Sequence, residues 1–171
     1  MTLRRYIPWP DKRLRSPAEP IEAVTDEIRT LWDDMIETMD AMPGVGLAAP
    51  QIGGMRQVAV VDASEARNKR IRLANPVILD ASAVLHPYEE ASPNLPGVSA
   101  VVRRPRGVKV CFLDENGAEV ERDFVGLEAV SVQHQIDHLA GRMFFDNRSQ
   151  TKRDMRLRRA RQANGSAGPH G

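Results

Sequence analysis

Two histidines stand four residues apart, at His134 and His138, separated by Gln-Ile-Asp. On a helix this spacing places both imidazole rings on one face, one turn apart, where two nitrogens can share one metal ion. The metalloprotease pattern His-Glu-x-x-His uses the same geometry, with its glutamate as general base. Gln135 stands at that glutamate position, so the pattern predicts a ligand pair without the base. Histidines at this spacing also occur as core residues, so a metal site is favoured only if the rest of the chain supplies a third ligand and a group that stabilises an electrophile.

The stretch at residues 44–51, Gly-Val-Gly-Leu-Ala-Ala-Pro-Gln, holds small residues that let the backbone approach another group closely. No lysine follows its Gly-x-Gly at the spacing of a phosphate-binding loop, and no predicted strand precedes it, so nucleotide binding is not expected. Gln51 is its one strongly polar residue. Two alternatives stay open for Gln51: a solvated loop residue, or a hydrogen-bond donor that points into a cleft.

The composition is that of an ordinary globular protein. The chain has 171 residues, of which 42% are hydrophobic, and a net charge of +1, which gives no global sign of nucleic-acid binding. No apolar run approaches the roughly 20 residues of a membrane span, and the first residues hold no apolar signal core, so we expect a cytoplasmic protein without a membrane partner. The single cysteine, Cys111, excludes an intramolecular disulfide and a multi-cysteine zinc site, and we expect it to be a buried thiol.

Hydrophobic spacing predicts the elements that position these residues. An amphipathic helix follows the cap residue Thr25, buries an apolar stripe that includes Met35, Met39 and Met42, and ends at Pro43. The histidines lie on a second helix that runs from after residue 126 to about residue 141. The other predictions are an extended arm at 1–20, strands at 58–61, 71–80 (with a bulge or an edge position at 75–76), 108–113 and 118–125, a turn at 114–117, and irregular chain at 87–105.

The last segment is strongly basic. Residues 148–161, from Arg148 to Arg161, hold seven basic residues and one acid, Asp154. The segment is either a solvated tail or a contact for an anionic surface such as ribosomal RNA. We expect residues 1–162 to form a single domain, and residues 163–171, rich in glycine and serine, to be a disordered tail.

Three motifs in one order resemble the peptide deformylase family. Residues 44–51 resemble its first motif. Residues 89–97, Glu-Glu-Ala-Ser-Pro-Asn-Leu-Pro-Gly, occupy the place of its second, usually Glu-Gly-Cys-Leu-Ser followed by x-Pro-Gly, and residues 134–138 occupy the place of its third, His-Glu-x-x-His. The similarity covers roughly residues 5–162. It implies an α+β fold in which strands wrap around a central helix carrying the two histidines, with an N-terminal amphipathic helix and a basic C-terminal helix.

The resemblance also implies roles for individual residues. The family uses a divalent metal, iron or zinc, to remove the formyl group from the N-terminal methionine of new chains. His134 and His138 match two metal ligands, and Gln51 matches the donor to the developing oxyanion. Ser92 stands where the family has its cysteine ligand, and Gln135 where it has its catalytic general base. Pro93 replaces the residue whose backbone N–H is the second oxyanion donor, and with Gly46 and Leu95 it is expected to contact the substrate.

Three of these matches depart from the family in ways that affect separate parts of the reaction. A thiol ionises near pH 8.5 and binds metal as a thiolate, whereas the hydroxyl of Ser92 rarely binds zinc or iron. The amide of Gln135 cannot carry a proton, and general acid–base catalysis is worth about 10²–10⁴-fold. Pro93 has no N–H, and one oxyanion donor is worth about 10²–10³-fold.

These departures leave two hypotheses. The chain is a deformylase-like protein with weak or no activity, whose cleft binds formyl-methionyl peptides or nascent chains and whose segment from Arg148 to Arg161 contacts the ribosome. Alternatively, it is an active metal-dependent deformylase with an altered metal shell, in which Ser92, Glu90 or a water completes the coordination and Asp137 serves as a displaced base. A plain interaction domain, in which the histidine pair is only packing, would require three accidental motif matches.

Overall fold

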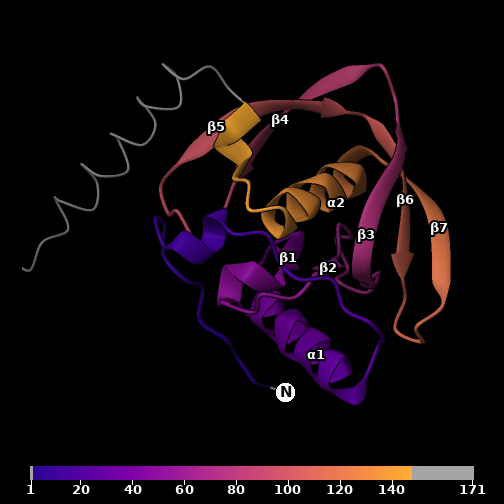
Figure 1. The fold of residues 1–171 in the computed structure, drawn as a ribbon. Helices are drawn as coiled ribbons and strands as arrows, with labels where there is room; N and C mark the ends of the chain where they lie inside the picture. Colours follow the sequence, from indigo (N-terminus) through magenta and orange to yellow (C-terminus); the bar gives the residue numbers. More distant parts are fainter. Residues whose placement is uncertain (1, 148–171) are drawn as a thin grey trace, which may run out of the picture.

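The computed structural model describes residues 2–147, and their α+β architecture confirms the expected fold. Helix α2 lies in the middle of the molecule, strands surround it, and α1 lies on the side opposite the β4–β5 hairpin (Figure 1). In chain order the elements are α1 (Asp26–Ala41), β1 (Gly46–Ala48), β2 (Val58–Val61), β3 (Ile71–Ala81), β4 (Leu85–Ala91), β5 (Ser99–Pro105), β6 (Gly107–Leu113), β7 (Glu119–Val125) and α2 (Gly126–Leu139), with short 3₁₀ helices at Lys12–Arg15, Ala49–Ile52 and Phe144–Asn147.

The larger sheet is antiparallel throughout, in the order β1-β2-β3-β6-β7. Of the two alternatives for residues 75–76, a bulge or an edge position, the structure shows a bulge in β3. The β3–β6 register shifts between Ala74 and Val77, and Asn75 has a left-handed φ of 47°. The side chain of Asn75 is fixed by hydrogen bonds with the backbone of Ile21. β3 is not an edge strand, because it pairs with both β2 and β6.

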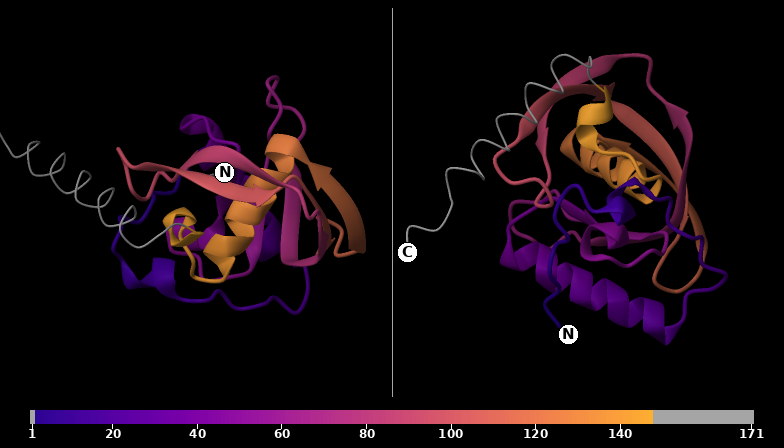
Figure 2. Two further views of the ribbon diagram at one scale, coloured as in Figure 1. Left: turned by 90° about the horizontal axis from the view of Figure 1, so that it is seen from above. Right: turned by 60° about the vertical axis from the view of Figure 1, so that its left-hand side comes forward.

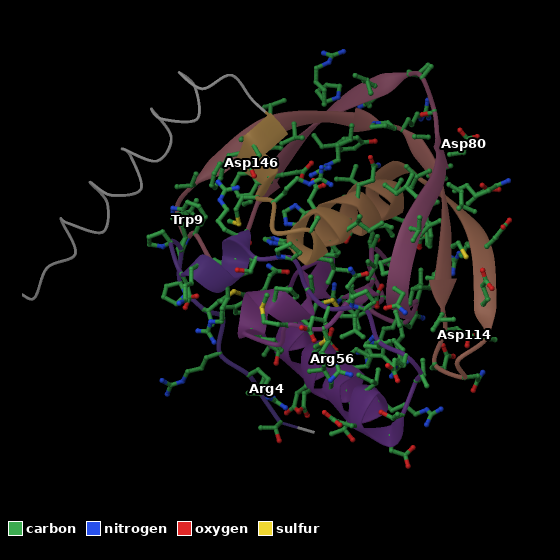
Figure 3. The ribbon with its side chains drawn as sticks, viewed as in Figure 1. Arg4, Trp9, Arg56, Asp80, Asp114 and Asp146 are labelled. Carbon is green, nitrogen blue, oxygen red and sulfur yellow. The ribbon has the colours of Figure 1, made fainter. Side chains whose placement is uncertain are left out.

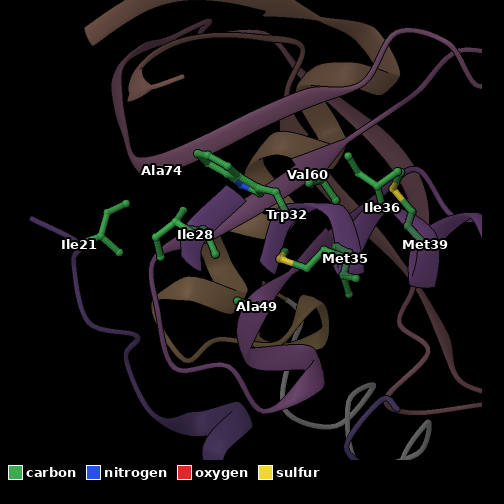
Figure 4. Close-up of a cluster of buried hydrophobic side chains, with 11 residues drawn as sticks. Ile21, Ile28, Trp32, Met35, Ile36, Met39, Ala49, Val60 and Ala74 are labelled. Atoms are coloured by element: carbon green, nitrogen blue, oxygen red, sulfur yellow. The ribbon is translucent and has the colours of Figure 1, made fainter. Parts of the chain in front are cut away.

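Helix α1 packs its apolar stripe on the sheet. The hydroxyl of Thr25 accepts a hydrogen bond from the N–H of Ile28, as expected of the cap residue. Trp32, Met35 and Met39 are fully buried (Figure 4), and the Trp32 indole N–H donates to the carbonyl of Ala59 at 3.1 Å. The prediction for Met42 was wrong: its side chain is 52% exposed, because the helix ends at Ala41.

Helix α2 is buried on most of its circumference because strands cover it on several sides. Ala129 and Val132 pack with the residues of β6 and β7, and Leu139 packs with Ala48 and Ala59 of β1 and β2. The helix therefore carries polar side chains into the interior, and each of them needs a partner there. The histidines that it carries are 8% and 1% exposed, for His134 and His138 respectively.

The prediction of irregular chain at 87–105 was wrong for both ends of the range, which are strands, and is confirmed only for the turns at residues 92–98 between them. β4 and β5 form a regular antiparallel hairpin, paired from Leu85 with Pro105 to Ala91 with Ser99. It arches over α2 on the side away from α1 (Figures 1 and 2). Cys111 was also misjudged: its side chain is only partly buried, and its thiol donates to Glu119 across the β6–β7 pair.

The arm before α1 lies on the body, with one 3₁₀ turn at Lys12–Arg15 that was not expected. Arg4, which is labelled in Figure 3, binds the buried carboxylate of Asp34 on α1. Trp9 packs edge-on against Phe145, with ring centroids 5.2 Å apart. The basic segment from Arg148 to Arg161, its expected helix, and the tail at 163–171 lie outside the described residues. Within residues 2–147, neither helix combines the length and the apolar composition needed to cross a membrane.

A glycine after α2 sets the exit of the chain from that helix. Gly141 has a φ of +77°, and a Cβ there would lie 2.8 Å from the backbone of Arg15. We expect Gly141→Ala to lower the free energy of unfolding by about 2 kcal/mol or more, from backbone strain and overlap together. Urea denaturation measures this, with Gly107→Ala as control, because its Cβ would meet its nearest neighbour at 3.5 Å. Equal losses in the two variants would contradict the explanation.

Candidate active site

A cleft of about 450 Å³ opens beside α2, between β1 and the β4–β5 hairpin. Of the eight residues to which the resemblance assigns a role, seven line it: Gly46, Gln51, Ser92, Pro93, Leu95, His134 and Gln135. His138 lies behind them, fully buried, and contacts the cleft residues from the interior. The remaining walls are largely apolar and include Tyr6, Met42, Val45, Val98, Leu127 and Val130.

The two histidines face one another, as their spacing predicts. Their Nε2 atoms are 3.1 Å apart, and the Nδ1 of His134 lies 2.8 Å from a carboxylate oxygen of Glu90. With Nδ1–H donating to Glu90, the Nε2 of His134 is an acceptor, which the Nε2–H of His138 can reach. Burial, and then the electrostatic effects of His134 and Arg104, hold the pKa of His138 well below its ordinary value, which favours the neutral imidazole.

A buried chain of charges orients His134. Arg104 binds Glu90 through two hydrogen bonds, of 2.6 and 2.9 Å, and Asp137 through a third, of 2.9 Å. Burial raises the pKa of Glu90, but hydrogen bonds from His134 and Arg104 outweigh it, and the pKa lies below its ordinary value. Asp137 also pairs with Arg142 at 3.2 Å. Glu90 therefore contacts the Nδ1 side of His134, away from the two Nε2 atoms, and Asp137 is paired with arginines; the structure contradicts their suggested roles as ligand and displaced base.

Ser92 belongs to a network of buried amides. Its hydroxyl accepts from the Nε2 of Gln51 at 3.2 Å, donates to the Oδ1 of Asn94 at 3.1 Å, and lies 3.5 Å from the Nε2 of His138. Gln51 is 1% exposed, so the structure selects a buried donor at the cleft over a solvated loop residue. Its Nε2 also donates to the Oδ1 of Asn94 at 2.9 Å, and its Oε1 accepts from the N–H of Ala48.

Gln135 fits tightly against β1. A Cβ at Gly46 would lie 2.5 Å from the Nε2 of Gln135, so only glycine allows the strand to approach this side chain so closely. The Oε1 of Gln135 is buried and has no hydrogen-bond partner among residues 2–147. The side chain is neutral and cannot exchange a proton at neutral pH.

The donor set around His134 and His138 does not fit an iron or zinc ion held by three protein ligands. The two imidazole nitrogens converge as ligands of one ion would. The third atom, however, is the hydroxyl of Ser92, which is already engaged with Gln51 and Asn94. Within residues 2–147, no three His, Cys, Asp or Glu side chains come together in a way that could hold a metal ion.

Two residues of the site were missed in the sequence. Asn94 fixes the amide network, and its Nδ2 donates to the backbone carbonyls of Ile7 and Gln51. Arg104 holds Glu90 and Asp137 together from β5, the strand that was expected to be irregular. Neither residue has a local signal, because Asn94 acts mainly through Ile7 and Gln51 and Arg104 acts through Glu90 and Asp137, all more than ten residues away in the chain.

A central helix with paired histidines, Gln51 beside it and a β-hairpin wall form the arrangement that the resemblance to peptide deformylases implies. The model of the polypeptide deformylase family matches residues 4–154. Peptide deformylases of Phenylobacterium zucineum and Methylocella silvestris are 43% and 46% identical to the chain, over 94% and 90% of its length and 96% and 81% of theirs. The chain therefore belongs to the peptide deformylase family, whose members are metal-dependent and act on formylated nascent peptides.

Solved structures agree with this assignment. A peptide deformylase from Legionella pneumophila superposes with a TM-score of 0.89 at 35% identity, covering 98% of this chain and all of the other. One from Ehrlichia chaffeensis in complex with actinonin gives 0.88 at 34% identity, over 95% and 98% of the two chains. A Met-Ala-Ser-bound enzyme from Acinetobacter baumannii gives 0.81 at 29% identity, over 86% and 99%.

Proposed function

We propose that the cleft binds the N-terminal methionine end of new polypeptide chains in the cytoplasm, and that the protein removes a formyl group from it slowly or not at all. The observation that carries this proposal is the bonding of Ser92 to Gln51 and Asn94, at the place where the family has a metal-binding cysteine. A complex of the related Acinetobacter baumannii enzyme with Met-Ala-Ser supports binding of such a peptide in this cleft.

Each residue of the cleft takes part in a different way. Gly46, Pro93 and Leu95 contact the bound peptide from β1 and the hairpin. Gln51 is the family's oxyanion donor, but its Nε2 is bonded to Ser92 and Asn94. Gln135 meets the reacting group with an amide that cannot take a proton from water or pass one to the leaving amine. The fold and the cleft are thus kept, while proton transfer and oxyanion stabilisation are weakened.

A second candidate is an active peptide deformylase with an altered metal shell. The comparisons favour it, because relatives 43% identical over nearly the whole chain carry the enzyme's name. In that case His134, His138 and the Ser92 hydroxyl hold an iron or zinc ion, with water completing the shell. Whole-chain identity supports the fold and the cleft, whereas the three side chains at positions 92, 93 and 135 determine the rate, so the rate has to be measured.

Formate release and metal content, measured on one preparation of the full chain, separate the two candidates. With formyl-Met-Ala-Ser as substrate, the first candidate predicts a rate lower by about 10⁴-fold or more than that of an active deformylase assayed beside it. It also predicts much less than one metal ion per chain. A stoichiometric ion together with turnover comparable to the active enzyme would establish the second candidate.

Removal of metal should leave the stability of the fold unchanged. Because hydrogen bonds among His134, His138 and Ser92 hold the pair together, we expect the same melting temperature with and without EDTA, and after addition of zinc. Differential scanning calorimetry measures this. Ser92→Cys serves as the positive control, since a thiolate restores the third ligand and its melting temperature should rise with zinc. A large fall in the melting temperature of the unmodified chain with EDTA would count against the first candidate.

We also propose that residues 1–162 form one domain, and that the segment from Arg148 to Arg161 binds the ribosome. The support is the sequence alone, with seven basic residues and one acid in that segment. Co-sedimentation with ribosomes should be lost when its arginines are replaced by glutamine, and should weaken as salt increases. Absence of co-sedimentation of the full chain at both low and moderate salt would remove the ribosome proposal.

A further inference from the structure

Neither of the two positions that match the family's oxyanion donors offers a free N–H in this cleft. The N–H of Ala48 donates to the Oε1 of Gln51 at 2.9 Å, which fixes the direction of that amide. Its Nε2 therefore faces Ser92 and Asn94 and donates to both, at 3.2 and 2.9 Å. Asn94 is fixed in turn, because its own Nδ2 donates to two backbone carbonyls. Pro93, at the place of the second donor, has no N–H.

The same cleft offers an acceptor that lacks a donor. Gln135 lines the cleft and is 4% exposed, and its Oε1 is buried without a partner among residues 2–147. An unpaired buried acceptor is unfavourable, and a ligand N–H that reaches it removes that cost. A bound group with N–H donors therefore complements this position.

The charges around the cleft also favour a ligand with N–H donors. Glu89 and Glu90 line it, and none of the described Lys or Arg side chains does. Glu90 is neutralised by its two hydrogen bonds with Arg104, whereas Glu89 lies exposed at the rim, where it accepts from the Ser99 hydroxyl at 2.8 Å. A carboxylate at the mouth of a largely apolar cleft favours a cation over a neutral group.

We infer that the cleft prefers a peptide whose N-terminal methionine carries a free amino group over one whose methionine is formylated. This inference rests on the proposed function, since it names which form of the peptide end the same cleft takes. A formyl group would bring its carbonyl oxygen to Gln51 and Pro93, where neither residue has a free N–H, and the oxygen would lose its water there. A free amino group has no such oxygen and directs N–H donors at the Oε1 of Gln135.

Isothermal titration calorimetry of the full chain with Met-Ala-Ser and with formyl-Met-Ala-Ser tests this preference, with formate assayed in the same sample. We expect the dissociation constant to be about tenfold lower for the free peptide. Gln135→Leu should reduce the difference, because it removes the acceptor for the amino group and leaves Gln51, Pro93 and Glu89 in place. The matched control is Gln133→Leu, which removes an equally buried glutamine of α2 whose Nε2 donates to the carbonyls of Pro105 and Ala129 outside the cleft. The control should keep the full difference.

Two further variants keep the inference testable if Gln135→Leu does not fold. Gln135→Glu keeps an acceptor, so it should keep or enlarge the preference for Met-Ala-Ser. Pro93→Leu supplies a backbone N–H, so it should narrow the preference by tightening the binding of the formylated peptide. Formyl-Met-Ala-Ser binding as tightly as Met-Ala-Ser, or more tightly, would overturn the inference and leave the proposed function standing. Binding of neither peptide would overturn both.

Discussion

The triple variant Ser92→Cys, Pro93→Leu, Gln135→Glu should release formate from formyl-Met-Ala-Ser about 10⁴-fold faster than the unmodified chain, or more. A carboxylate at position 135 can accept and return a proton, which is worth about 10²–10⁴-fold, and a restored N–H at position 93 is worth about 10²–10³-fold. The thiol at position 92 supplies the third metal ligand and releases one N–H of Gln51 from its bond to the serine hydroxyl. The measurement is the initial rate of formate release in the presence of added iron or zinc.

The single variants should show that the three changes act together. Ser92→Cys alone should restore metal binding and little activity, because the proton acceptor is still missing. Gln133→Glu is the control for an added carboxylate, since position 133 lies on the same helix outside the cleft lining, and it should not raise the rate. If the unmodified chain released formate as fast as the triple variant, the Ser92 hydroxyl and the Gln135 amide would suffice for the reaction. The assignment of slow turnover to these residues would then be wrong.

Arg104→Met should lower the free energy of unfolding by about 3–5 kcal/mol, the range for removal of one partner of a buried ion pair. Arg104 and Glu90 are 5% and 6% exposed, so water cannot replace the arginine, and the Glu90 carboxylate would keep only its hydrogen bond with His134. The double variant Arg104→Met, Glu90→Gln should recover part of the lost free energy of unfolding, because it also removes the buried negative charge of Glu90. Urea denaturation at neutral pH measures both variants.

A surface ion pair provides the comparison. Arg122 lies 3.4 Å from Glu128, with its side chain 46% exposed, so Arg122→Met should change the free energy of unfolding by less than about 1 kcal/mol. Similar losses in the free energy of unfolding for Arg104→Met and Arg122→Met would mean that burial does not make the Glu90–Arg104 pair more important for stability. The role of the buried pair would then be limited to orienting His134.

The parts of the fold that the sequence predicts are those with a local signal. The stripe of Trp32, Met35 and Met39 identifies α1, and the four-residue spacing of His134 and His138 places the two rings together. Both follow from the helical period of 3.6 residues, which needs no knowledge of the rest of the chain. The β6–β7 hairpin is likewise marked by its turn at residues 114–117.

The parts that the sequence does not predict depend on partners that are distant in the chain. Prolines at 87, 93, 96 and 105 made residues 87–105 look irregular, yet Pro87 and Pro105 lie in a two-stranded sheet in which each strand has a free edge. Asn94 and Arg104 have no periodic neighbours, and their roles arise from contacts with Gln51, Glu90 and Asp137. Met42 sits in register with the buried stripe, but the helix stops one residue earlier.

The amide of Asn94 ties the start of the chain to the centre of the molecule. The carbonyl of Ile7 accepts from its Nδ2 at 2.6 Å, and the N–H of Ile7 donates to the carbonyl of Gln51 at 2.9 Å. During synthesis, residue 7 leaves the ribosome long before residue 94 exists to receive it. This part of the arm can therefore take its place only after the loop that joins β4 and β5 has been made, so the cleft is completed late in folding, and a product terminated before residue 94 would lack this contact for its arm.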